Sequence, residues 1–192
     1  MLKPKIIITA VIVWLIMAIQ SQAQIQSTNL VPLPATILEN LESTTGQVII
    51  KATAPVGSVN CNGAVITIVC KEDTMASTGH KEHGVTVGIS INGQPDDRTV
   101  IDFDELDSLI SSLDYLNGIT WSVTSLSSFD AIFTTKAGLR VAVFSSKRSG
   151  QIEFALRSSR MDTGIIMPPD QRAQFRLLLV GAKAKLVALR NG

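Results

Sequence analysis

The chain has few of the residues on which most active sites depend: its 192 residues include two histidines, two cysteines and one tyrosine. Aromatic residues make up 5% of the sequence, too few for a nucleic-acid interface that stacks bases on rings. The sequence also lacks a nucleophile-elbow serine motif, a phosphate-binding loop, a paired CxxC motif and an HExxH zinc motif. These absences argue against the enzyme classes that such motifs identify. We expect no cofactor and no nucleic-acid partner.

The first 23 residues have the pattern of a secretory signal peptide. Lys3 and Lys5 precede Ile6–Ile19, an uncharged apolar run of 14 residues. Small residues then lie three and one positions before a cut that we expect between Ala23 and Gln24. The run is shorter than the roughly 20 apolar residues of a membrane span, and the rest of the sequence contains no apolar run that exceeds it in length. We therefore predict a secreted or periplasmic protein, cleaved near Ala23, with no transmembrane span in the mature chain.

The remaining chain divides into an arm and one domain. Residues 24–46 are polar and then punctuated by prolines, which favours an extended N-terminal arm with a short helical turn at 35–41. Residues 47–192 have the patterns of an α+β domain, with a polar loop at 71–84. Strands are expected at 47–54 (broken by Pro55 and Gly57), 64–70, 85–91, 99–101, 130–135, 139–145, 151–158 and 164–167.

Two amphipathic helices follow the two groups of strands. Asp102 and Glu105 have the spacing of a capping box at the start of the first helix, and Pro168 begins the second. Their apolar stripes are Leu106, Leu109, Ile110, Leu113 and Leu116, and then Phe175, Leu178, Leu179, Ala182 and Leu186. This order predicts an α+β fold of antiparallel β-meanders, each followed by an amphipathic helix. It also suggests that residues 47–117 and 128–190 are repeats.

The two parts of the chain carry opposite charge. Residues 24–130 contain 4 basic and 13 acidic residues, a net charge of −9, whereas residues 131–192 contain 11 basic and 3 acidic residues, a net charge of +8. One interpretation is that the two parts pack on each other within one chain. The other is a head-to-tail contact between copies, which would make the protein an oligomer, or a basic face for an anionic partner.

Cys61 and Cys70 could form a disulfide, because the predicted secretion favours one. However, the strand expected between them spans roughly 20 Å, whereas a disulfide requires Cα atoms within about 7 Å. The alternative is two buried thiols that act as small apolar residues.

Two groups of side chains could hold a metal ion. His80, His83 and Glu82 could share one with Glu72, although their spacing matches no specific zinc site and a solvated loop is the alternative. A hard cation such as Ca²⁺ could bind an acidic run that lacks the EF-hand glycine, and helix capping is the alternative there. The run comprises Asp96, Asp97, Asp102, Asp104, Glu105 and Asp107.

A group of basic residues could form an anion-binding patch, although a solvated face explains them equally well. The patch would comprise Lys147, Arg148, Arg157, Arg160, Arg172 and Arg176. Export and the scarcity of aromatic residues argue against nucleic acid as its ligand. The aromatic side chains expected in the core and on the sheet faces are Trp121, Phe129, Phe133, Phe144 and Phe154.

The segment from Ile101 to Leu116, with its IDFDELDSL start, resembles a segment of small exported bacterial proteins of unknown function. The strand pair at 129–146 and the terminal helix are similar to theirs in order. The resemblance implies an exported α+β domain and carries over no activity and no site residues. The meander-plus-helix pattern is also similar to that of small single-stranded nucleic-acid-binding folds, an analogy of fold alone.

These observations favour an exported, non-enzymatic binding or protein-interaction module, whose partner is an unidentified protein or anion. Two alternatives stay open. One is a metal- or ligand-dependent enzyme or carrier that uses the His80/His83 loop. The other is a structural subunit that assembles through its opposite charges.

Overall fold

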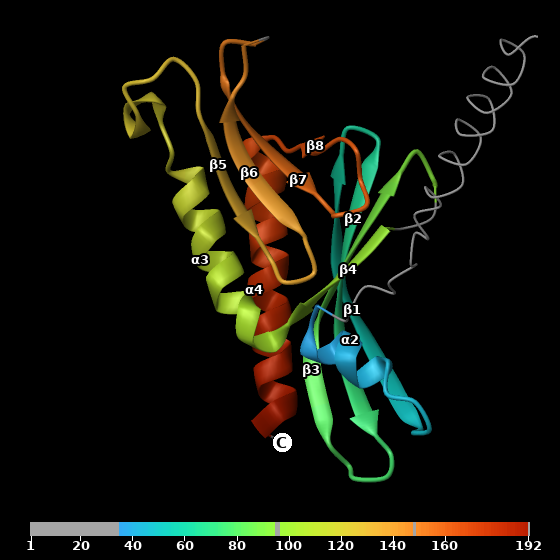
Figure 1. Ribbon diagram of the computed structural model, residues 1–192. Helices are drawn as coiled ribbons and strands as arrows, with labels where there is room; N and C mark the ends of the chain where they lie inside the picture. The colour runs from blue at the N-terminus through green and yellow to red at the C-terminus, as the bar shows by residue number, and fades with distance from the viewer. Residues whose placement is uncertain (1–34, 95–96, 148, 192) are drawn as a thin grey trace, which may run out of the picture. The chain divides into compact units, whose positions relative to one another are not determined.

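In the computed structural model, which describes residues 35–94, 97–147 and 149–191, two four-stranded antiparallel sheets form the framework (Figure 1). Each sheet is a meander in which every strand pairs with the next one along the chain. The first sheet contains β1 (Ile49–Cys61), β2 (Ala64–Met75), β3 (Lys81–Ile91) and β4 (Asp97–Asp102). The second contains β5 (Asp130–Thr134), β6 (Arg140–Ser145), β7 (Ile152–Arg157) and β8 (Ile165–Ile166). The predicted α+β class is confirmed.

The helices occupy three places along the described chain. They are α2 (Ile37–Glu42), α3 (Leu106–Asn117) and α4 (Pro169–Asn191), with short 3-10 turns η1 (Phe103–Glu105) and η2 (Trp121–Val123). The order sheet–helix occurs twice, but β1, β2 and β3 have 11 to 13 residues, whereas β5, β6 and β7 have five or six. The predicted repeat of 47–117 and 128–190 is therefore not confirmed.

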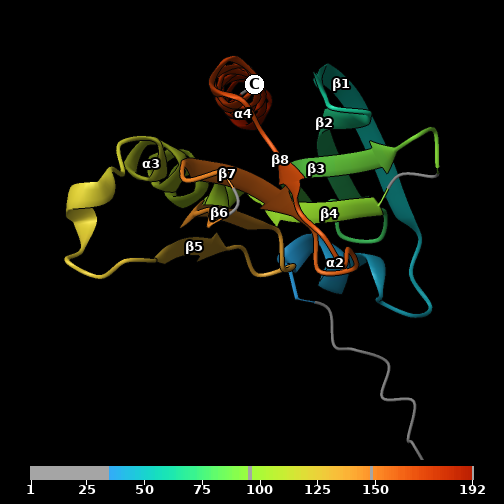
Figure 2. The ribbon, with the colours of Figure 1, turned by 90° about the horizontal axis from the view of Figure 1, so that it is seen from above.

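Each long helix packs on the sheet of the other half of the chain. α3 follows the first sheet but contacts β5 and β6 of the second sheet, whereas α4 follows the second sheet but contacts β1, β2 and β3 of the first. The two helices also contact each other, and Figure 2 shows α3 beside the second sheet, with α4 next to it. The main backbone contacts of each long helix with a sheet are therefore made with the sheet of the other half of the chain.

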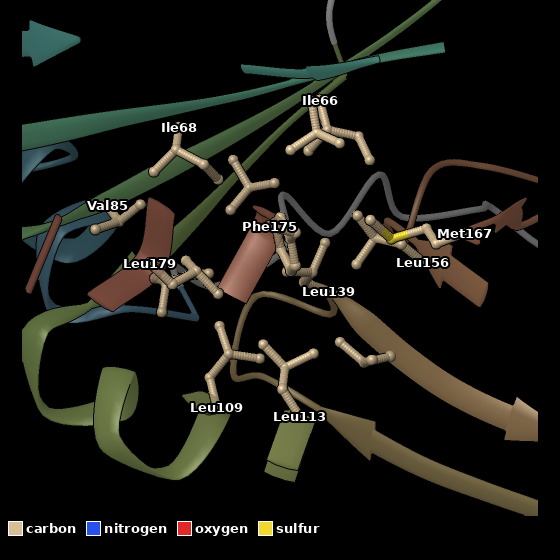
Figure 3. Close-up of a cluster of buried hydrophobic side chains, with 14 of the residues drawn as sticks. Ile66, Ile68, Val85, Leu109, Leu113, Leu139, Leu156, Met167, Phe175 and Leu179 are labelled. Atoms are coloured by element: carbon tan, nitrogen blue, oxygen red, sulfur yellow. The ribbon is translucent and has the colours of Figure 1, made fainter. Parts of the chain in front are cut away.

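One continuous core results from this exchange. Figure 3 shows side chains of the first sheet, such as Ile66 and Ile68, above Leu109 of α3 and Phe175 of α4. In the second sheet, Leu156 belongs to the same cluster. Eight of the ten predicted stripe residues are buried, and Leu178 is partly buried; the buried ones are Leu106, Leu109, Leu113, Leu116, Phe175, Leu179, Ala182 and Leu186. The tenth, Ile110, is also only partly buried.

Two local predictions in the first sheet differ from the structure. The strand expected to break at Pro55 continues to Cys61, because a β-bulge between Pro55 and Gly57 absorbs the irregularity. The polar loop expected at 71–84 is mostly the extended ends of β2 and β3, which pair as far as Thr74 and Lys81. Polar residues occupy consecutive positions at these strand ends, so the sequence there shows no alternation of apolar and polar residues that would reveal a strand.

The short helical turn predicted at 35–41 is present as α2, and its buried side chains pack within the domain. Thr36 caps α2, since its side-chain oxygen accepts a hydrogen bond from the Glu39 N–H at 3.1 Å. Leu38 and Leu41 of α2 are buried. The signal peptide expected at 1–23 and the arm residues 24–34 lie outside the described residues, as do Asp96 and Arg148.

The buried carboxylate of Asp102 joins three segments of the chain. Its oxygens accept hydrogen bonds from the backbone N–H groups of Ile37 at 2.8 Å and Leu38 at 3.2 Å, at the start of α2. Lys136, in the turn between β5 and β6, donates to it at 3.4 Å. The Glu105 side chain reaches back to the Asp102 N–H at 3.4 Å, as the capping-box spacing predicts. Asp102 therefore connects both sheets and caps a helix distant in sequence.

We expect Asp102→Ala to lower the free energy of unfolding by about 3 kcal/mol, because it leaves buried donors without their charged acceptor. Urea unfolding of the purified protein measures this loss. Asp104→Ala is the matched control, since Asp104 also bonds Lys136 but is 61% exposed, and it should cost less than about 1 kcal/mol. Equal losses in the two variants would show that Asp102 is not a special junction.

Candidate functional site

The two histidines lie at the tip of the β2–β3 hairpin, on opposite faces of the first sheet. His80 Nε2 lies 2.9 Å from Glu82 Oε1, whereas His83 Nε2 lies 3.0 Å from Glu72 Oε2. A hydrogen bond from Lys81 and a second one from His83 hold the pKa of Glu72 below its usual value, although burial opposes them. Because alternate strand residues point to opposite faces, the expected shared ion site of His80, His83 and Glu82 is not assembled. No group of three or more metal-ligating side chains is present within the described ranges.

The acidic run is divided among separate neighbours. Asp102 caps α2, as described above, and Glu105 accepts a hydrogen bond from the Lys136 N–H at 2.7 Å. The remaining described members are Asp97, which accepts from the Ser158 hydroxyl, Asp104, which pairs with Lys136, and Asp107, which pairs with Lys183. The carboxylates therefore serve capping and ion pairing and do not converge on a common point.

The opposite charges of the two parts of the chain meet within one molecule. Asp114 of α3 pairs with Arg176 of α4, whose Nη2 lies 2.7 Å from Asp114 Oδ2. This hydrogen bond lowers the pKa of the Asp114 carboxyl and raises that of Arg176. Burial acts to lower the pKa of Lys136, yet the hydrogen bonds that it donates to Asp104 and Asp102 raise it above its ordinary value. These pairs support intramolecular packing of the acidic and basic parts.

The predicted basic patch is dispersed. Lys147 is exposed in the β6–β7 turn, and Arg160 is exposed in the loop after β7. Arg157 lies at the opposite end of β7 from that turn, while Arg176 is engaged by Asp114. Arg172 stacks over the Phe154 ring, with 5.2 Å from Cζ to the ring centroid, and burial lowers the pKa of its guanidinium. The described members therefore form no single anion-binding face.

Both cysteines are buried, unbonded thiols, and the possible disulfide is not formed in the structure. Cys61 pairs with Ala64 at one end of the β1–β2 ladder, and Cys70 lies six residues further along β2, about 20 Å away. The Cys70 thiol donates to the Ala182 carbonyl at 3.5 Å. Burial raises the pKa of both thiols; Asp170 adds to the effect at Cys61, whereas Lys185 opposes it at Cys70.

Exposed apolar side chains gather between the end of α3 and β5. We call them the aromatic surface, and they are Tyr115, Trp121, Val123, Leu126 and Ile132. Tyr115 is 69% exposed, Trp121 47% and Leu126 72%. The only charged residue between Tyr115 and Ile132 is Asp130. Neutral exposed apolar surface of this kind is uncommon on proteins that act alone.

Two hollows flank Tyr115. One, of about 360 Å³, lies between the end of α3 and the η2 segment, where Gly118 and Val123 line it together with the carboxylate-bearing Asp114. The other, of about 290 Å³, lies between α3 and β5, where Ser111 and Phe133 line it. Trp121 is held in place by Phe129, whose ring it meets edge-on with centroids 5.9 Å apart. The exposed rings and the hollows beside them thus form an uneven surface into which side chains of another molecule could fit.

Sequence reasoning missed this surface for two reasons. Trp121 was expected in the core, but the η2 turn leaves nearly half of it exposed, whereas Phe154 is buried as expected. Tyr115 lies off the apolar stripe of α3, and that position was a signal of exposure. The absence of charge from 115 to 129 was the second signal.

No family model matches the chain, and no curated protein matches it in sequence. Within the described residues, no helix combines the length and apolar character needed to cross a membrane.

We expect neither Cys61 nor Cys70 to be alkylated in the folded protein at pH 8.5, because burial and a raised pKa both disfavour the reactive thiolate. Both should react once the chain is unfolded in denaturant, and mass spectrometry counts the adducts. The untreated protein should have the mass of the reduced chain. A mass lower by two hydrogen atoms, with no reaction after unfolding, would establish the disulfide.

Proposed function

We propose that this protein is an exported, non-enzymatic interaction module that binds a protein partner through the aromatic surface. The observation that carries the proposal is the exposure of Tyr115 and Trp121 beside two hollows in a neutral segment. Tyrosine and tryptophan contribute most to binding at protein interfaces, because their large rings bury much area at small entropic cost. Charged residues are depleted at the centres of such interfaces.

The export part of the proposal rests on the leader pattern of residues 1–23. The histidine-based alternative has lost its shared site, because His80 and His83 point to opposite faces. Assembly through opposite charges is less favoured, because part of that charge is already paired within the chain, as between Asp114 and Arg176.

Site-specific photo-crosslinking in the producing cell tests the binding surface. A photo-reactive residue in place of Val123 should give a discrete crosslinked product, because Val123 lines the hollow beside Tyr115. The matched control replaces Leu177, which is 64% exposed on α4, far along the chain from the aromatic surface, and should give none. Adding Tyr115→Ser should reduce the Val123 product about tenfold or more, as removal of an interface aromatic does. Equal products from both positions, or none, would contradict the proposal.

The export part predicts that the mature protein begins at Gln24. Mass spectrometry of protein recovered from outside the cytoplasm of the producing cell should show this N-terminus. Ala23→Lys should block cleavage, because signal peptidase requires a small residue before the cut, and the leader should then stay attached. Wild-type protein that retains Met1 and stays in the cytoplasm would contradict export and leave the binding surface to be judged by the crosslinking result.

A further inference from the structure

β5 is an edge strand whose outer side is unpaired within the described chain. The Ser145 N–H donates to the Phe129 carbonyl at 3.0 Å, and the Thr135 N–H donates to the Leu139 carbonyl at 2.9 Å. The odd-numbered residues of this segment therefore direct their backbone groups toward β6. Because these directions alternate, the N–H and C=O groups of residues 130, 132 and 134 face outward.

The other sheet edges carry several features that discourage pairing, whereas β5 carries one charged residue, Asp130. The β1 edge contains Lys51, Pro55 and a bulge, and the β4 edge contains Asp97 and Arg98. β8 has two residues and is soon followed by prolines. The DAIFT sequence of β5 contains no proline, lysine or arginine. An edge with few such guards is a template for a further strand.

We propose that a second copy of this chain occupies the edge, with β5 pairing antiparallel to β5 of the second copy about a two-fold axis at Ile132. The two second sheets then form one continuous sheet. The inference rests on the proposed function, because it names the partner for the part of the aromatic surface that contains Ile132. The axis follows from the backbone, since outward-facing groups at Ile132 can exchange hydrogen bonds with the same residue of the second copy.

This register is self-complementary along the strand. Ile132, which is 56% exposed in the single chain, lies against Ile132 of the second copy. Asp130 lies opposite Thr134, so the one charged residue of β5 does not face its own like charge. Ala131 lies opposite Phe133 on the face that carries α3, so a small side chain meets a large one. Each pairing is favourable or neutral.

Charge on the outer face of the second sheet also favours this arrangement. Thr134, Arg140 and Arg157 lie opposite one another in a row across β5, β6 and β7, so two cations are neighbours. Asp130 and Glu153 belong to another row, at the other end of the same strands. Antiparallel pairing places Asp130 of the second copy beside Thr134, in line with the two arginines. The anionic row of each copy thus extends the cationic row of the other.

The helix face above the edge has no charge to oppose the contact. Ser111, Ser112 and Tyr115 of α3 line the hollow beside β5. The acidic residues Asp107 and Asp114 pair with α4 instead. In the dimer, the two α3 helices lie on the same side of the joined sheet, and the Tyr115 rings flank the seam.

Sedimentation velocity of the mature chain over a range of concentrations tests the dimer. We expect a dimer for the wild type, and at least a 100-fold larger dissociation constant for Ile132→Lys and Ile132→Pro. The proline removes an N–H that points away from β6, so the ladder to β6 keeps its hydrogen bonds. Leu177→Lys, at an equally exposed apolar position on α4, should dimerise like the wild type. Circular dichroism of every variant checks that it is folded.

Two further variants test the register. Asp130→Lys should also weaken the dimer, because it brings a third cation beside the arginine row. Ile132→Cys should form a disulfide-linked dimer on oxidation, since paired Cα atoms lie about 5.5 Å apart, within disulfide range. Leu177→Cys should not, and Cys61 and Cys70 are too buried to compete.

A wild-type monomer at all concentrations, or a dimer unaffected by the Ile132 variants, overturns the edge dimer. The mass of the photo-crosslinked product separates this result from failure of the proposed function. A product containing two copies of the chain supports both proposals. A product containing a different protein, with a monomeric chain, retains the interaction module and rejects self-pairing.

Discussion

Each long helix buries its apolar stripe on a sheet supplied by the other half of the chain, and this exchange determines how the charges are used. α3 and α4 must lie side by side, which brings Asp114 to Arg176 and Asp107 to Lys183. Such exposed pairs contribute little free energy individually, so apolar burial holds the helices and the charges favour their relative orientation. Asp102 completes the connection, because its carboxylate holds the start of α2 and a turn of the second sheet.

The same exchange leaves one side of α3 without charge. The acidic side of the helix is turned toward α4, so serines and Tyr115 remain beside β5. β5 is also an edge strand of the second sheet, and α3 contacts it. A neutral helix face, an unguarded strand edge and the Trp121 segment therefore adjoin. The aromatic surface is thus a consequence of the packing that stabilises the core.

The sequence contained the local information for much of this fold and little of the nonlocal information. Both helices and the residues of their stripes could be predicted, because a period of 3.6 residues is a local property. The pairing of each helix with the distant sheet could not, since no pattern within α4 states which sheet covers Phe175. The hairpin carrying His80 and His83 was missed because its polar strand ends have no apolar alternation, and the metal hypothesis depended on a loop. Trp121 was misplaced because a large apolar side chain is usually buried, which is a tendency and not a rule.

Self-pairing at β5 would change what the rest of the aromatic surface can do. The paired strands bury Ile132, whereas Trp121 and Leu126 belong to the segment before β5 and stay outside the paired residues. A two-fold axis then presents two copies of that segment on one rigid sheet. A partner with two matching sites gains avidity without a tighter individual contact, because the second binding event becomes intramolecular. A dimer is therefore compatible with a further protein partner: the strand edge fixes the assembly, and the remaining exposed rings are left for recognition.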